Sequence, residues 1–167
     1  MATARAPARQ GGFSLIETLV AMVILATGML GIAALYVESL RAGYSANSRT
    51  LAVNLAADMA DRIRANRAGR QFYAVGTGNA GGMPTPCGEM AGVAAQNCTP
   101  EQMARFDIWL WKSMLGETND ANFQRIGLQR ASGEVRINTA TQPNSFFIRI
   151  SWSERDEDYN YTLSAVI

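Results

Sequence analysis

The residues most able to do chemistry are few: one acid in an apolar stretch, Glu17, and two cysteines, Cys87 and Cys98. The cysteines lie eleven positions apart, and the chain has no histidine. Because zinc sites draw on clustered cysteines and histidines, and this pair is not a C-x-x-C, we expect no metal site. In an oxidising compartment the short spacing favours a disulfide that closes a small loop. The alternative is two free thiols.

Glu17 is the one charged residue between Phe13 and Val37, a stretch of 25 residues. A carboxylate inside a bilayer costs ~2.5–3.5 kcal/mol near the centre and less towards the interface, and such a residue is by default a functional-site hypothesis. Glu17 lies about one helical turn inside the stretch, since a turn takes ~3.6 residues. We therefore expect an interaction that offsets the cost of its charge.

The element that positions Glu17 is a membrane helix. As a helix, residues 13–37 would span ~37 Å, enough to cross a hydrocarbon core of ~30 Å. An ordinary secretory signal has an apolar core of only ~7–15 residues, and a plain membrane anchor explains the length but not the acid. Arg5 and Arg9 precede the stretch. By the positive-inside rule the N-terminus stays in the cytoplasm and the rest is translocated.

Residues 11–17, Gly-Gly-Phe-Ser-Leu-Ile-Glu, resemble the processing site of type IV prepilins and type II secretion pseudopilins. The resemblance implies cleavage between Gly12 and Phe13 by a prepilin peptidase, then N-methylation of Phe13. It also implies a partner for Glu17, the cationic N-terminus of a neighbouring subunit. An ion pair in low dielectric is strong, although desolvation offsets much of its energy. Glu17 would then set the axial offset between subunits.

The helix should continue beyond the membrane, because residues 36–67 contain no proline and apolar residues recur every four positions. These are Leu51, Leu55, Met59 and Ile63. We interpret the stripe as core packing, with a partner groove as the alternative. Four arginines follow, at positions 62, 64, 67 and 70. They suit a helix C-terminus ending near Gly69 better than a DNA-binding patch.

A second helix should begin after a glycine- and proline-rich loop over residues 76–86, which no regular element fits. Thr99, Pro100 and Gln102 predict its start, as N-cap, first helical residue and capping-box partner. Gly116 should end the helix. Its core-facing residues should be Met103, Phe106, Leu110 and Met114.

Three strands should follow, over residues 133–138, 145–153 and 159–167. The acidic run 154–158 predicts a solvated hairpin loop, and its alternative is a calcium site. We therefore expect an α+β fold, a pilin-like ladle whose long N-terminal α-helix packs by its second half on a small antiparallel sheet. The expected parts are a cleaved leader (1–12), a transmembrane half-helix (13–37) and a periplasmic head (38–167).

The rest of the chain is similar to minor pilins called type IV pilus modification proteins, PilV. The likeness rests on Cys98-Thr99-Pro100 opening a helix and on the strand Ile-Arg-Ile-Ser-Trp over residues 148–152. It implies a low-copy structural subunit in the bacterial inner membrane, and then in the pilus, that primes or modifies assembly. Its partners would be other minor pilins, the major pilin, the prepilin peptidase and the inner-membrane assembly machinery. A minor pseudopilin of type II secretion and a DNA-uptake or adhesive pilin are the alternatives.

Composition points away from other functional classes. Without Arg5 and Arg9 the chain has 13 basic and 14 acidic residues, so its net charge implies no nucleic-acid partner. The chain has no histidine that could activate a serine or cysteine, and no Gly-x-x-x-x-Gly-Lys phosphate loop is present. We therefore expect neither an enzyme nor a cofactor.

The mature protein should begin at Phe13 and carry a methylated amine. Cleavage should depend on Gly12, because a side chain there would crowd the scissile bond. N-terminal mass spectrometry of membrane-extracted protein measures both modifications. An intact leader in cells with an active prepilin peptidase would contradict the prediction.

Overall fold

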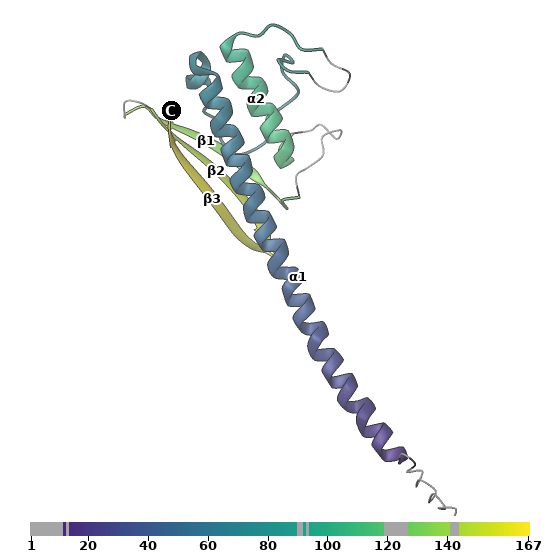
Figure 1. Cartoon of the computed structure of the whole chain (residues 1–167). Coiled ribbons are helices and arrows are strands. Elements are labelled where there is room, and N and C mark those ends of the chain that lie inside the picture. The colour runs from purple at the N-terminus through teal and green to yellow at the C-terminus, as the bar shows by residue number, and fades with distance from the viewer. Residues whose placement is uncertain (1–11, 13, 90–91, 93, 119–126, 141–143) are drawn as a thin grey trace, which may run out of the picture. The chain divides into compact units, whose positions relative to one another are not determined.

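The structure is a computed structural model, and it describes residues 12, 14–89, 92, 94–118, 127–140 and 144–167. Its contacts divide the chain into two compact units, residues 1–43 and 44–167. The elements, in chain order, are α1 (Leu15–Ala65), the 3-10 helix η1 (Arg67–Phe72), α2 (Pro100–Leu115), β1 (Ser132–Asn138), β2 (Ser145–Glu154) and β3 (Glu157–Val166) (Figure 1).

The three strands form one antiparallel sheet in the order β1-β2-β3. Ile148 at its centre lies opposite Val135 on β1 and Leu163 on β3. The predicted α+β fold is confirmed. The acidic hairpin loop is shorter than predicted, because β2 and β3 extend to a two-residue turn at Arg155 and Asp156. Both turn residues have positive φ, 50° and 67°, as the hairpin turn that matches strand twist requires.

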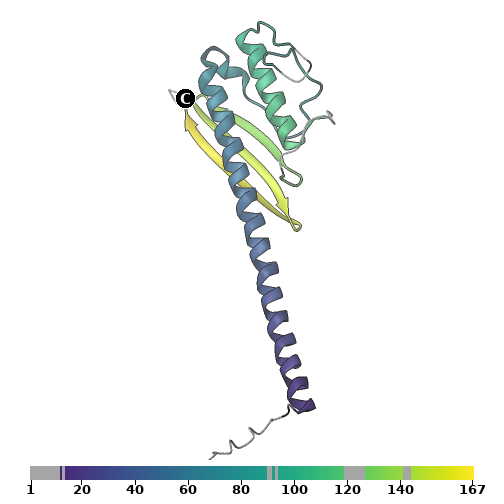
Figure 2. The same ribbon diagram turned by 45° about the vertical axis from the view of Figure 1, so that its right-hand side comes forward.

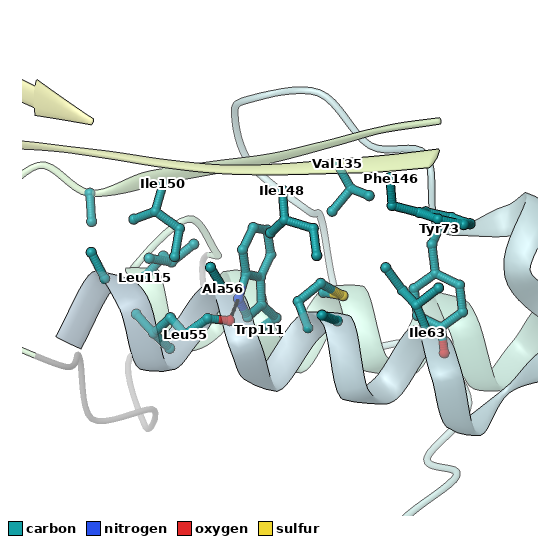
Figure 3. Close-up of a cluster of buried hydrophobic side chains, with 14 of the residues drawn as sticks. Leu55, Ala56, Ile63, Tyr73, Trp111, Leu115, Val135, Phe146, Ile148 and Ile150 are labelled. Atoms are coloured by element: carbon teal, nitrogen blue, oxygen red, sulfur yellow. Dashed lines mark hydrogen bonds between the residues drawn. The ribbon is translucent and has the colours of Figure 1, made fainter. Parts of the chain in front are cut away.

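The core lies between the inner face of the sheet and the 44–65 part of α1, beside which α2 also lies (Figure 2). The predicted stripe is confirmed: Leu55, Met59 and Ile63 are buried, and Leu51 is half-buried. Figure 3 shows side chains of the sheet pointing towards this stripe, among them Val135, Phe146, Ile148 and Ile150. Burying a large aliphatic side chain contributes about 1.5–3 kcal/mol, so this layer supplies much of the stability of the 44–167 unit.

Helix α2 begins and ends as predicted. Thr99 accepts a hydrogen bond from the Gln102 backbone, the Gln102 side chain accepts one from the Thr99 N–H, and Gly116 caps the C-terminus at φ 80°. The predicted core face was wrong. Of its four residues only Phe106 is buried, while the centre of the face consists of Ala104, Trp111 and Leu115.

Trp111 explains why a different face of α2 is buried than the one predicted. Its indole N–H donates to the Leu55 carbonyl of α1 over 3.0 Å (Figure 3), and its ring lies against Gly133. A Cβ at Gly133 would collide with the ring. The indole has a large apolar surface and an N–H donor that needs an acceptor when buried. Trp111 is therefore buried in the core, while Met103 and Met114 are half-buried.

Gly69 does not end α1 as predicted. The helix ends at Ala65, and Gly69 lies inside η1, where its N–H donates to the Asn66 side chain over 3.2 Å. Asn66 also donates to the Pro100 carbonyl over 2.7 Å, at the start of α2. A Cβ at Gly69 would collide with that carbonyl. Glycine is therefore needed here for the close approach of α2.

The predicted disulfide joins Cys87 and Cys98, with their Cα atoms 5.6 Å apart. Cys98 directly precedes Thr99, the N-cap of α2. The bridge therefore attaches the end of the glycine- and proline-rich loop to the start of a packed helix.

Replacing both Cys87 and Cys98 by serine should lower the free energy of unfolding of the head by about 2–3 kcal/mol, the loop-entropy contribution of a bridge of this spacing. The α1 segment before residue 44 should keep its helicity. Thiol alkylation before and after reduction, with thermal unfolding of the variant, measures both effects. Two readily labelled thiols in unreduced protein would contradict the bridge.

Candidate functional site

The predicted processing residues lie at the start of the described chain. Gly12 is exposed, and no described atom lies within 4 Å of the position that a Cβ on it would occupy. Phe13 and the arginines of the leader lie outside the described residues. Cleavage and methylation therefore stay predictions.

The first half of α1 is apolar and exposed on all sides. Every residue from Leu15 to Gly43 is exposed, with Leu15 at 82%, Leu30 at 71% and Leu35 at 74% of their full accessible surface. The helix is long and apolar enough to cross a membrane. Soluble proteins rarely expose contiguous apolar surface on this scale, so lipid or other apolar helices must cover it.

The polar side chains of this segment differ in how they are satisfied. Thr18 donates its hydroxyl to the Leu15 carbonyl over 2.8 Å, and Thr27 donates to the carbonyls of Val23 and Ile24 over 3.1 and 3.0 Å. Both hydroxyls thus bond within their own helix, which suits a hydrocarbon environment. For the Glu17 carboxylate, the described part of the chain supplies no hydrogen bond or ion pair.

The helix itself compensates the Glu17 charge only in part. Glu17 lies in the first turn of α1, where its N–H donates to the Ser14 carbonyl over 3.0 Å. A negative charge near a helix N-terminus gains only ~0.3–1 kcal/mol, which offsets part of the cost of a carboxylate inside the hydrocarbon boundary. The chemistry open to this carboxylate is therefore to accept a cation from outside the helix.

A buried polar network in the head was missed at the sequence level. Asp107 on α2 accepts hydrogen bonds from Arg62 over 3.0 Å and from the Tyr73 hydroxyl over 2.5 Å. Arg62 also donates to Asp58, four residues before it on α1, over 2.8 Å. We call these four residues the Asp107 network. It joins the C-terminal end of α1, η1 and α2.

The charges of the Asp107 network support one another. Burial alone would lower the pKa of Arg62, but the carboxylates of Asp58 and Asp107 raise it above its ordinary value. Burial, together with the hydrogen bond to Asp107, raises the pKa of Tyr73. At neutral pH Arg62 is therefore charged and Tyr73 is a neutral donor, so the network is structural.

Lys112 is a fully buried cation that the sequence did not predict. Its side chain is fully buried, and Nζ donates to the carbonyls of Gly76 and Gly78 over 2.8 and 3.1 Å. Nζ also pairs with Glu117 over 2.9 Å, and Glu117 in turn accepts the backbone N–H groups of Gly78 and Gly133. The start of the glycine-rich loop is therefore held to α2 and β1. A lysine within the apolar run Trp-Leu-Trp-Lys-Ser-Met-Leu was the available signal.

Neither Arg62 nor Lys112 is arranged for catalysis. In both places each charge is bonded to structural partners, which leaves no activated acid, base or nucleophile. Within the described residues, no group of three or more histidine, cysteine, aspartate or glutamate side chains could hold a metal ion. Glu17 thus remains the residue whose chemistry calls for a partner.

Comparison with known families gives two adjacent matches. The prokaryotic N-terminal methylation motif matches residues 7–33, and the model of the Tt1218-like family, described as type IV pilin Tt1218, matches residues 34–109. No curated protein and no solved structure matches the chain. The first match covers the second half of the leader together with Phe13 and Glu17, and the second covers the rest of α1, the disulfide and the start of α2.

Asp107→Ala should lower the free energy of unfolding of the head by about 1–3 kcal/mol, because it leaves the buried Tyr73 hydroxyl without its acceptor and removes one of the two carboxylates bonded to Arg62. Asp58→Ala is the matched control, since it also removes a carboxylate bonded to Arg62. Asp58 is exposed to 41% and Asp107 to 10%, so the control should cost less than about 1 kcal/mol. Chemical denaturation of both variants measures the difference, and equal losses would contradict a structural Asp107 network.

Proposed function

We propose that this chain, which is a type IV pilin-like prepilin, is a minor pilin: a low-copy structural subunit that primes or modifies the assembly of a type IV pilus. The observation that carries the proposal is an exposed apolar segment of α1, residues 15–37, whose one acid, Glu17, has a partner in neither its own helix nor the described head. Pilins are structural subunits that assemble with other pilins after processing. A helix of this kind suits a bundle of identical or similar helices, where a neighbour supplies the missing cation.

Processing creates the cation that Glu17 needs. Cleavage after Gly12 would free an amine at Phe13, four residues before Glu17 in the chain. Within one straight helix that amine and the carboxylate of the same subunit are held about one turn apart. A neighbour displaced along the axis brings its own amine level with Glu17. The pair therefore forms at one axial offset between subunits and specifies that offset.

The proposed topology follows from the same features. The leader, residues 1–12, would stay in the cytoplasm, residues 13–37 would span the inner membrane, and residues 38–167 would form a periplasmic head. The arginines of the leader support the orientation. The Cys87–Cys98 disulfide supports a head in an oxidising compartment. The proposed partners are other minor pilins, the major pilin and the inner-membrane assembly machinery.

The minor role is proposed from the likeness of the head to pilus modification proteins, and it has a consequence for the phenotype. A subunit that primes assembly is needed in few copies, so its loss should reduce the number of surface pili while the shaft consists of another protein. A minor pseudopilin would share the N-terminal segment. Its loss would impair secretion and leave pili intact, so the same deletion strain separates the two functions.

Glu17→Leu should yield a processed, membrane-inserted protein that fails to support piliation. The apolar stretch stays long enough to span the membrane, but the neighbour's amine loses its partner in an apolar bundle. The measurements are the surface pilus yield in a gene-deletion background and membrane fractionation of the variant.

Two further variants sharpen this test. Glu17→Gln keeps the size and polarity of the side chain and removes only its charge, so it should fail as Glu17→Leu does. Thr18→Val removes the neighbouring hydroxyl, which bonds its own helix, and should leave piliation unchanged. Normal piliation by Glu17→Leu, where deletion of the gene abolishes pili, would rule out the registry role.

A further inference from the structure

The two edges of the sheet differ in how they are closed. On β1, Val135 exchanges two backbone hydrogen bonds with Val75, of 2.8 and 3.0 Å, so a piece of the preceding loop covers that edge. On the other side β3 is the last strand, ten residues long. Among the described residues, no backbone hydrogen bond reaches β3 from beyond the sheet.

The register shows which groups of β3 face outward. The two-residue turn makes Glu154 and Glu157 a hydrogen-bonded pair, and such pairs alternate along an antiparallel ladder. Two backbone bonds agree with this phase: Ser153 donates to Gln129, away from β3, and Ile167 donates to Asn144, across the sheet. The N–H and C=O groups that face the free edge therefore belong to Asp158, Asn160, Thr162, Ser164 and Val166.

This edge lacks the features that normally prevent strand pairing. Proteins protect edges with lysines, prolines, bulges or short strands, and β3 contains no lysine, proline or glycine and pairs regularly along its whole length. Between Tyr159 and Val166 it carries no charge, and two tyrosines, a threonine and a valine there favour strand formation. Its charges lie at one end, in Glu157 and Asp158.

We propose that the free edge of β3 binds an extended segment of another, non-identical protein of the pilus, which adds a fourth strand to the sheet by β-augmentation. The five outward residues each offer one donor and one acceptor. The partner segment should be uncharged along most of its length. It should carry a lysine or arginine where it passes Asp158, because the acidic end of β3 favours a basic side chain opposite.

A second copy of this chain fits the edge poorly, an argument that rests on the proposed function. Antiparallel pairing of two identical β3 strands in a continuous sheet would run the two copies' 44–65 helix segments in opposite directions. Subunits inserted in one membrane with one orientation run them in the same direction. Parallel pairing close to register would instead bring Glu157 and Asp158 of the two copies together, and like charges on neighbouring strands are destabilising.

A proline at a β3 residue whose N–H faces the free edge tests strand binding there without unfolding the head. Thr162→Pro removes one outward N–H and no bond of the ladder to β2, and proline is tolerated on edge strands. Thr162→Ala removes the same side chain but keeps the N–H. In the full chain, Thr162→Pro should lose surface pili to the level of the gene deletion, whereas Thr162→Ala should support normal piliation. Both variants should be processed, and both should unfold at the temperature of the unmodified protein.

A photo-crosslinking residue at Asn160, in cells that assemble pili, tests the partner directly. The adduct should contain a second protein, its cross-linked peptide should be extended and hold a basic residue, and Thr162→Pro should abolish it while Thr162→Ala keeps it. The control position is Ser151, the cross-strand neighbour of Asn160 on the central strand β2. An adduct of two copies of this chain, or an adduct insensitive to Thr162→Pro, would overturn the proposal.

The outcomes separate this proposal from the proposed function. Full piliation by Thr162→Pro, in a background where gene deletion removes pili, refutes strand binding at the β3 edge and leaves the minor pilin function intact. Normal piliation after gene deletion refutes the pilus function, and the Asn160 cross-link still decides whether the edge binds a strand. If Thr162→Pro unfolds at a lower temperature, Ser164→Pro repeats the test at the next outward position.

Discussion

The structure depends on one constraint, which is that a single 51-residue helix must satisfy two environments. Up to Gly43 every described side chain of α1 is exposed and most are apolar, so lipid or neighbouring helices must bury the apolar ones. From residue 48 onwards one face is buried against the chain's own sheet and α2, with Ala52, Ala56 and Ala60 fully buried. The alanines let the other elements approach α1 closely. One helix can therefore be held by the head and remain available to an assembly.

Buried charge then fixes the head around this helix. Buried ion pairs contribute little net stability compared with apolar packing, but an incomplete pair is costly, which disfavours misplaced arrangements. The Asp107 network positions α2 against the end of α1, and the Lys112–Glu117 pair holds the glycine-rich loop to α2 and β1. Together with the disulfide, these contacts hold a loop-rich segment that has little regular structure of its own.

The groups and surfaces that the described chain leaves without a partner suit assembly with other proteins. Among the described residues, the Glu17 carboxylate has no partner, and neither the apolar half of α1 nor the outer edge of β3 is covered. Each requires a different kind of group: a cation, apolar helices and an extended backbone. Because an unpaired charge in hydrocarbon and an unprotected edge strand are both unfavourable in isolation, a second protein gains free energy by covering them.

The sequence by itself determined the apolar helix, the position of Glu17, the cap of α2, the three strands and the disulfide, because each rests on local periodicity or on residues close in the chain. Tertiary structure alone decided which face of α2 is buried, because α2 carries apolar residues on several faces. The Leu55 carbonyl, which accepts the indole N–H, and Gly133, which leaves room for the ring, place Trp111 in the core. Tertiary structure also decided the role of Gly69, the partners of Asp107 and Lys112, and which edge of the sheet stays open. These depend on contacts between distant residues, whose geometry no local pattern encodes.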